Sequence, residues 1–99
     1  MKLITLFILC IPIQLISQNL VRNPSFEKTK KCADSISLFN TIVERWSTPT
    51  LGTADLFNAC SAFKAGVPNN FNGHQISKFG NNYAGCYFYA KSNYREYIQ

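Results

Sequence analysis

A short apolar run at the N-terminus limits which part of this chain can belong to the folded protein. Residues 3–16 are almost wholly apolar, with one positive charge, Lys2, before them and small or polar residues from Ser17 onward. This order of charge, apolar run and polar residues is typical of a secretory signal peptide. We therefore predict a signal peptide at residues 1–17 and an exported mature chain at residues 18–99.

A membrane anchor is the other interpretation of the apolar run. A transmembrane helix needs about 20 apolar residues. This run is shorter, and Pro12 and Gln14 interrupt it. We therefore expect cleavage, and no transmembrane span in the mature chain.

The composition of the mature chain favours β-structure. Residues 18–99 are rich in aromatic residues and asparagine and poor in helix-forming residues. Residues 83–90 and 94–99 both alternate between side-chain types, which predicts a β-hairpin. An all-β sandwich usually needs about 100 residues or more, and the second predicted strand runs to the last residue. We expect an all-β fold that is an incomplete N-terminal portion of a longer module.

The alternation in residues 83–90 predicts two faces of a strand. The face with small apolar side chains, expected toward the core, contains Ala84, Cys86, Phe88 and Ala90. The opposite face contains Tyr83, Tyr87 and Tyr89. Tyrosines on such a strand either belong to the core or form an exposed platform on which sugar rings stack. These three tyrosines are therefore candidate ligand-binding residues, with a core role as the alternative.

Shorter patterns predict the remaining elements. Residues 20–26 indicate a first strand bent at its proline. Residues 36–43 mix helical and strand signals, and we interpret them as a loop or short helical turn before Trp46, which we expect in the core. Residues 55–58 indicate a short strand, and residues 65–80 a long loop with Asn-Gly and Gly-Asn turn signals.

Three cysteines follow the predicted cleavage site, so an oxidising compartment leaves one of them unpaired. Cys32 and Cys60 lie in polar, loop-like sequence, whereas Cys86 lies in the predicted strand. We predict a Cys32–Cys60 disulfide and a buried Cys86, since free cysteine is among the most buried residue types. Zinc is the alternative, but the chain has no C-x-x-C spacing and its only histidine is His74.

The residues able to perform acid–base chemistry form no recognisable constellation. The acidic residues are Glu27, Asp34, Glu44, Asp55 and Glu96. No spacing among them points to a glycosidase pair. His74, with Ser77 nearby, could act as a base, but a lone loop histidine is more often a surface or loop-fixing residue. We predict that the protein is not an enzyme.

The positive charge does not indicate a nucleic-acid partner. The formal net charge is +5 at pH 7, and nucleic-acid binders gather Lys and Arg on one face. Here only Lys28, Lys30 and Lys31 lie together, and the other basic residues are scattered. We interpret the charge as an ordinary solvated surface.

The phrase NLVRNPSFE at residues 19–27 resembles the start of galactose-binding-like jelly-roll modules of the carbohydrate-binding type, which open Asn-Leu-x-x-Asn-Gly-x-Phe-Glu. Trp46 matches a following tryptophan. Residues 80–99 match a Gly-x-x-Tyr-Ala-Gly strand that leads to a hairpin ending in Gln. The resemblance implies a jelly-roll or β-sandwich whose N-terminal part is residues 18–99.

The order of several separated motifs is more specific than the opening phrase. The motifs in order are NPSFE, Cys32, Trp46 and residues 55–60, 67–71, 83–85 and 94–98. Together they are similar to an N-terminal module of exported surface proteins in gliding, polysaccharide-degrading Gram-negative bacteria. Those proteins often carry an OmpA-like or secretion-sorting C-terminal domain. The resemblance implies a secreted, outer-membrane or cell-surface location, and C-terminal domains of the same protein as partners.

The same resemblance implies a structural calcium ion as the one possible cofactor. In the wider sandwich family this ion often lies beside the Phe-Glu of the first strand, which points to Asn23 and Glu27. Calcium takes six to eight oxygen ligands, and others would normally come from a C-terminal strand outside this chain. The alternative is that Glu27 caps the local chain or pairs with Lys28 or Arg22.

Two function classes follow from these observations. The first is a noncatalytic extracellular binding module for a glycan or cell-surface polymer, with the three tyrosines as its contact. The second is a structural or interaction module of an outer-membrane-associated protein, with no small ligand. Exposed tyrosines favour the first class, and buried tyrosines favour the second.

Overall fold

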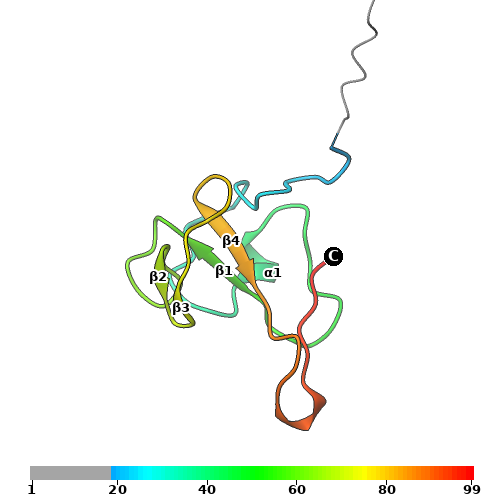
Figure 1. The fold of residues 1–99 in the computed structure, drawn as a ribbon. Helices are drawn as coiled ribbons and strands as arrows, with labels where there is room; N and C mark the ends of the chain where they lie inside the picture. The colour runs from blue at the N-terminus through cyan, green and yellow to red at the C-terminus, as the bar shows by residue number, and fades with distance from the viewer. Residues whose placement is uncertain (1–18) are drawn as a thin grey trace, which may run out of the picture.

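The computed structural model describes residues 19–99, so the predicted signal peptide at residues 1–17 lies outside the described residues. The elements in chain order are α1 (Phe39–Ile42), β1 (Asp55–Asn58), β2 (Asn69–Asn70), β3 (Gly73–His74), β4 (Asn82–Gly85) and the 3-10 turn η1 (Lys91–Asn93) (Figure 1). In the described part of the chain β1 pairs with β4 and β2 pairs with β3, each pair antiparallel. This portion is therefore built of short strands and loops, as an all-β prediction requires.

Helix α1 is a single turn, which agrees with the mixed signals of its sequence. Phe39 and Ile42 are both buried and point to the same side of the turn. The helix ends where Val43 turns to an extended conformation, and Val43 then forms an isolated antiparallel bridge with Thr29. No helix within residues 19–99 has the length and apolar character needed to cross a membrane.

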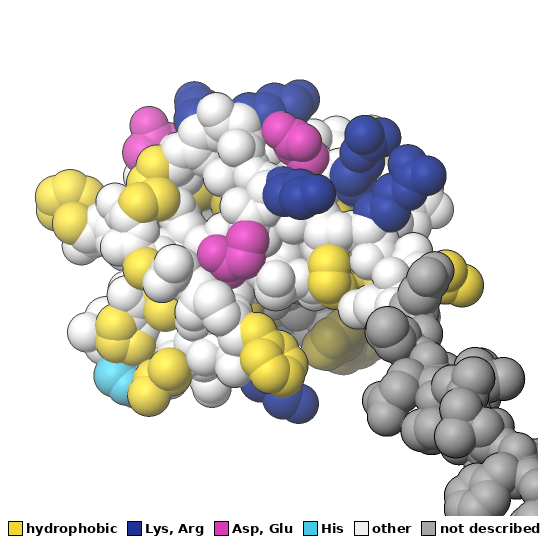
Figure 2. Space-filling model, turned by 90° about the horizontal axis from the view of Figure 1, so that it is seen from above, with side chains coloured by type: hydrophobic (Ala, Val, Ile, Leu, Met, Phe, Trp, Pro, Cys, Tyr) yellow, Lys and Arg dark blue, Asp and Glu magenta, His cyan; other side chains and the backbone are white. Residues whose placement is uncertain are grey.

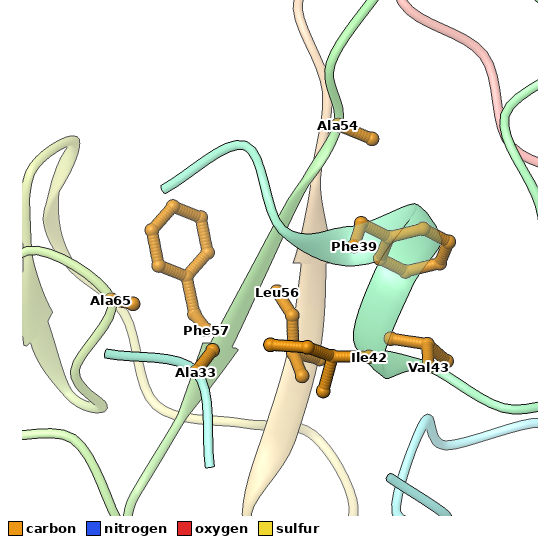
Figure 3. Close-up of a cluster of buried hydrophobic side chains, with 8 residues drawn as sticks. All are labelled: Ala33, Phe39, Ile42, Val43, Ala54, Leu56, Phe57 and Ala65. Carbon is orange, nitrogen blue, oxygen red and sulfur yellow. The ribbon is translucent and has the colours of Figure 1, made fainter. Parts of the chain in front are cut away.

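Strand β1 lies at the centre of the fold, and all four of its residues are buried. Leu56 points toward Ile42 of helix α1, and Phe57 points to the opposite side of the strand (Figure 3). The Phe57 ring packs against the ring of Tyr83, its partner in β4, with centroids 5.1 Å apart. Gly85 leaves room for this packing, because a Cβ there would lie 2.5 Å from Phe57 Cε2. Strand β1 is thus covered on both faces.

Along the edge of β1 away from β4, hydrogen-bonding groups find their partners in loops. Asn58 donates its side-chain amide to the carbonyls of Ala33 and Ala65, at 3.2 and 3.1 Å, and its own N–H to Ala65. At the other end, the Ser37 N–H donates to the Asp55 carboxylate over 2.6 Å. The residues at the two ends of β1 therefore hydrogen-bond with loops on the side where no strand pairs with β1. Buried backbone groups need such partners.

The core gathers around β1 and α1 (Figure 3). Its fully or nearly fully buried hydrophobic residues are Ala33, Phe39, Ile42, Val43, Ala54, Leu56, Phe57 and Ala65. Trp46 packs against this cluster as predicted. Its ring is tilted by 53° to that of Phe26, with centroids 5.1 Å apart, and its indole N–H donates to the Asn23 carbonyl. A core of this size is small, which makes the covalent and polar cross-links described below important for stability.

The predicted first strand at residues 20–26 is wrong. This segment contains bends and turns, and both Asn23 and Phe26 have positive φ, at 54° and 60°. The cause is the Asn23 side chain, which donates to the carbonyls of Lys28 and Glu44 and accepts the Lys28 N–H. These bonds hold the segment in a turn, where asparagine tolerates the left-handed region.

Candidate functional site

The main candidate site is a projecting hairpin that we call the aromatic arm, residues 87–94. It begins shortly after β4, turns through η1 and returns toward the body of the protein, and it extends away from the sheets in Figure 1. The Ala90 N–H donates to the Tyr94 carbonyl, which closes the turn. Ser92 and Asn93 at its tip have positive φ, as a tight turn requires. The predicted hairpin therefore exists, but its two sides are joined by an isolated bridge and do not form two long strands.

The aromatic side chains at the start of the arm are exposed to solvent. Tyr87 is 45% exposed, Phe88 84% and Tyr89 72%. Phe88 was expected in the core, so that prediction is wrong. Strand β4 ends at Gly85, so these three side chains lie beyond its pairing with β1.

Tyr83 is less exposed than the other two predicted tyrosines. It is half-buried, packs on Phe57 and contacts the Asn70 amide through its hydroxyl. Tyr83 therefore joins β4 to the β2–β3 hairpin. Of the three predicted tyrosines, Tyr87 and Tyr89 are the exposed ones, and the Tyr87 hydroxyl donates to the Asn72 side-chain oxygen over 3.4 Å.

The root of the arm is fixed by a buried carboxylate, Glu96, which is 5% exposed. One of its oxygens accepts the Tyr87 N–H and the other accepts the Tyr94 hydroxyl, both at 2.9 Å. The Tyr94 hydroxyl in turn accepts the Thr53 N–H. Glu96 thus ties both sides of the arm to the loop before β1.

This role of Glu96 was not predicted from the sequence. The sequence pattern that could have indicated it lies in residues 94–98, where Tyr94, Glu96 and Ile98 are every second residue and so share one face of an extended segment. A carboxylate between two apolar positions of the same face is expected to be buried and hydrogen-bonded.

Cys86 lies between the arm and the core. It lines an apolar groove of about 470 Å³ whose lining residues are Phe26, Ala84, Cys86, Phe88, Glu96, Tyr97 and Ile98. Burial raises the pKa of the Cys86 thiol, and the nearby charges of Glu96 and Asp55 raise it further. Cys86 is half-buried and packs against the core, so it has the character of a small hydrophobic residue rather than a reactive thiol.

The two residues that the resemblance assigned to calcium are both engaged in hydrogen bonds. The Asn23 side-chain oxygen accepts the Lys28 N–H over 2.9 Å. A Glu27 carboxylate oxygen accepts the N–H groups of Asn81 and Asn82, both at 2.9 Å. No group of three or more His, Cys, Asp or Glu side chains suited to a metal ion is found within residues 19–99. Glu27 here joins the N-terminal segment to the start of β4.

The predicted disulfide between Cys32 and Cys60 is confirmed, with Cα atoms 6.0 Å apart. It lies next to Asn58, whose side-chain oxygen contacts both sulfur atoms and accepts the Ala33 N–H over 3.1 Å. The covalent link and the Asn58 amide therefore hold the same two segments together at the end of β1.

Comparisons with protein-family models, with curated proteins and with solved structures find no match to this chain.

Proposed function

We propose that this chain is a noncatalytic binding module that works outside the cell, and that the aromatic arm is its contact with a glycan or an envelope polymer. The observation that carries the proposal is the exposure of Tyr87, Phe88 and Tyr89 on an arm with a fixed root. Exposed neighbouring aromatic side chains are uncommon on a surface without a partner. Their rings offer flat faces to the apolar C–H faces of sugars, and the tyrosine hydroxyls can hydrogen-bond with sugar hydroxyls.

The fixed root supports binding because it limits the entropy lost when a ligand is bound. A platform on a free loop would have to be ordered by the ligand, at a cost of about 0.5–1.5 kcal/mol for each immobilised side chain. Here Glu96 and the Ala90–Tyr94 bridge hold both sides of the arm before any ligand arrives.

The location and the finer fold are parts of the same proposal. The Cys32–Cys60 disulfide is compatible with an oxidising, extracellular compartment. Residues 18–99 would then form the N-terminal part of a galactose-binding-like jelly-roll in a secreted or surface-associated protein. The opening phrase of residues 19–27 and the hairpin of the arm support this view.

A glycan array probed with the purified protein tests the function. We expect binding to one or more polysaccharides, and we expect the double variant Tyr87→Ala/Tyr89→Ala to lower that affinity at least about tenfold. The control is Tyr97→Ala, which removes a tyrosine about as exposed as Tyr87 (46% against 45%) outside the arm. Absence of glycan binding, or binding that the double variant leaves unchanged, would overturn the proposal.

A structural or interaction role is the second candidate, and the groove beside Cys86 favours it. Most of the groove's lining residues are apolar, among them Ala84 and Ile98, and Phe88 at its edge is largely exposed. A partner domain that packs against this groove would cover Phe88 and need no small ligand. Under this alternative, Phe88→Ser would weaken association with the partner domain, and the glycan array would show no binding.

A further inference from the structure

A second hollow in the surface is lined by residues that precede β3, and it ends next to Asn72, whose side-chain oxygen accepts the Tyr87 hydroxyl of the aromatic arm over 3.4 Å. We call it the Phe63–Phe71 groove. It has a volume of about 380 Å³ and is lined by Ala62, Phe63, Lys64, Asn69, Asn70 and Phe71. Phe63 is 79% exposed and Phe71 57% exposed. Two large aromatic side chains in solvent at one hollow are the kind of surface that marks a binding site.

The backbone beneath the Phe63–Phe71 groove is held in place from several directions. The Phe71 N–H donates to the Lys64 carbonyl over 2.9 Å, which fixes the two aromatic segments relative to each other. Ala65 is fully buried and accepts two hydrogen bonds from Asn58. Gly66 packs so closely that a Cβ there would lie 2.6 Å from the Asn69 carbonyl oxygen. The backbone of the groove is therefore preorganised, which lowers the part of the entropy cost of binding that comes from ordering the main chain.

The polar groups at the groove are donors and a cation. The Asn69 side-chain oxygen is already bonded to His74 Nδ1 at 2.7 Å, which leaves the Asn69 NH₂ group to donate to a ligand. Lys64 brings a positive charge to the groove, and no carboxylate is among its lining residues. Figure 2 shows hydrophobic side chains directly beside His74, the single cyan residue. Flat rings, an amide donor and an ammonium group together match a sugar ring that carries a negative charge.

From this arrangement we infer that the Phe63–Phe71 groove binds an anionic sugar unit, with its ring against Phe63 or Phe71 and its carboxylate or sulfate group at Lys64. This goes beyond the proposed function of the aromatic arm, because it names a separate site and a charge requirement. The Asn69 amide, held in orientation by His74, donates to a ring hydroxyl.

A single-stranded nucleic acid is the competing ligand, since bases also stack on aromatic rings. Nucleic-acid sites add a positively charged path along the backbone. Lys64 is the one cation among the residues that line this groove. One cation fits one charged sugar unit better than a run of phosphates.

Isothermal titration of the purified protein tests the inference with four probes. The probes are a galacturonate trisaccharide, a sulfated galactan oligosaccharide, the neutral galactose trisaccharide and an eight-nucleotide oligo-dT. We expect binding of at least one of the two anionic saccharides and at least about fivefold weaker binding of the neutral one. The first two probes show whether the site takes carboxylate or sulfate. Tighter binding of oligo-dT than of both anionic saccharides would overturn the inference.

Variants place the binding in the groove. We expect Lys64→Gln to remove most of the preference for the anionic over the neutral saccharide, and Phe71→Ala to weaken both at least about tenfold. Lys78→Gln and Phe79→Ala are the matched controls, at exposed positions outside both the groove and the aromatic arm, and neither should change this binding. All four positions are exposed, and circular dichroism checks that each variant folds. Binding that Tyr89→Ala removes and Phe71→Ala leaves unchanged would overturn this inference and support the arm. Failure of all four probes would overturn this inference too, while the glycan array tests the arm separately.

Discussion

The Glu96 carboxylate accepts the backbone N–H of Tyr87 over 2.9 Å, across nine residues of chain. In return the Glu96 N–H donates to the Tyr87 carbonyl over 2.8 Å. Glu96 therefore binds the backbone of Tyr87 twice, once through its side chain and once through its main chain. This pair, rather than a regular strand ladder, sets where the aromatic arm leaves the body of the protein.

Replacement of Glu96 should loosen the arm. Glu96→Ala leaves the Tyr87 N–H and the Tyr94 hydroxyl without their acceptor, so we expect a loss of about 1–3 kcal/mol in the free energy of unfolding. Hydrogen exchange at the Tyr87 amide should become faster, and NMR measures it directly. Glu44→Ala, at an exposed position, is the control. Unchanged exchange at Tyr87 would show that Glu96 does not hold the arm.

The pH dependence of stability should report on Asp55. Burial raises the pKa of Asp55 above its ordinary value of 3.8, the Ser37 N–H opposes this, and the Glu96 charge adds to it. The folded state therefore binds the Asp55 proton more tightly than the unfolded state does. The stability from this group is fully present below pH 3.8 and is lost as the pH rises through the folded-state pKa.

Asp55→Asn tests this dependence because it keeps an oxygen for Ser37 and removes the charge. We expect its stability relative to the wild type to increase as the pH rises from about 4 to about 7. Urea unfolding at a series of pH values measures the difference. A difference that stays constant over this range would contradict the assignment to Asp55.

Cys86 should react slowly with thiol reagents in the native protein. Its raised pKa lowers the thiolate fraction, and its partial burial limits access. We expect alkylation by iodoacetamide near neutral pH to be at least about tenfold slower than in the protein unfolded by guanidinium. Asp55→Asn should speed the native reaction, because it removes one of the charges that raise this pKa. Native labelling as fast as that of the unfolded chain would refute this view of Cys86.

Gly85 should tolerate no side chain. In Gly85→Ala the new Cβ would meet the Phe57 ring at 2.5 Å, and overpacking of this kind costs about 1–3 kcal/mol. Adding Phe57→Leu should recover part of the loss in Gly85→Ala, because the smaller side chain makes room. Denaturant unfolding of the single and double variants measures both effects. If Gly85→Ala were as stable as the wild type, the Phe57 ring could move away from the new Cβ at no cost in stability, and the prediction would be wrong.

Removal of the disulfide should be costly for so small a core. The double variant Cys32→Ser/Cys60→Ser opens a link between residues 28 positions apart, which is worth about 3 kcal/mol in the chain-entropy model. Cys86→Ser, which removes the unpaired thiol, is the control. Thermal and denaturant unfolding should show a large loss for the double variant alone. A loss below about 1 kcal/mol would contradict the prediction.

Features that depend on local sequence or on simple pairing could be predicted. The Cys32–Cys60 link followed from compartment and loop-like surroundings, and the strand at residues 55–58 and the Trp46 packing followed from short apolar patterns. The Asn72-Gly73 turn signal likewise falls where β3 begins, at Gly73, which has a φ of 127°. The strand and the turn are decided within a few residues of chain, and the disulfide followed because only three cysteines were available to pair.

Features that depend on a second layer could not be predicted. Alternation in residues 83–90 shows which side chains would share a face, but it cannot show whether anything covers that face, and Phe88 is exposed for this reason. The turn at Asn23 depends on bonds to Lys28 and Glu44, the second of which is 21 residues away. For the candidate site, Tyr87 and Tyr89 were identified from sequence, whereas Glu96 and the Phe63–Phe71 groove required the three-dimensional arrangement.

The contact of Glu27 with Asn81 and Asn82 joins positions 54 and 55 residues apart. A ribosome makes residue 27 well before either partner, at about 5–20 residues per second. The Glu27 contact can therefore form only after Asn82 has been made, whereas the bonds of Asn23 to Lys28 and Glu44 have both partners much earlier. The N-terminal segment can thus be joined to the body of the fold in two steps during synthesis.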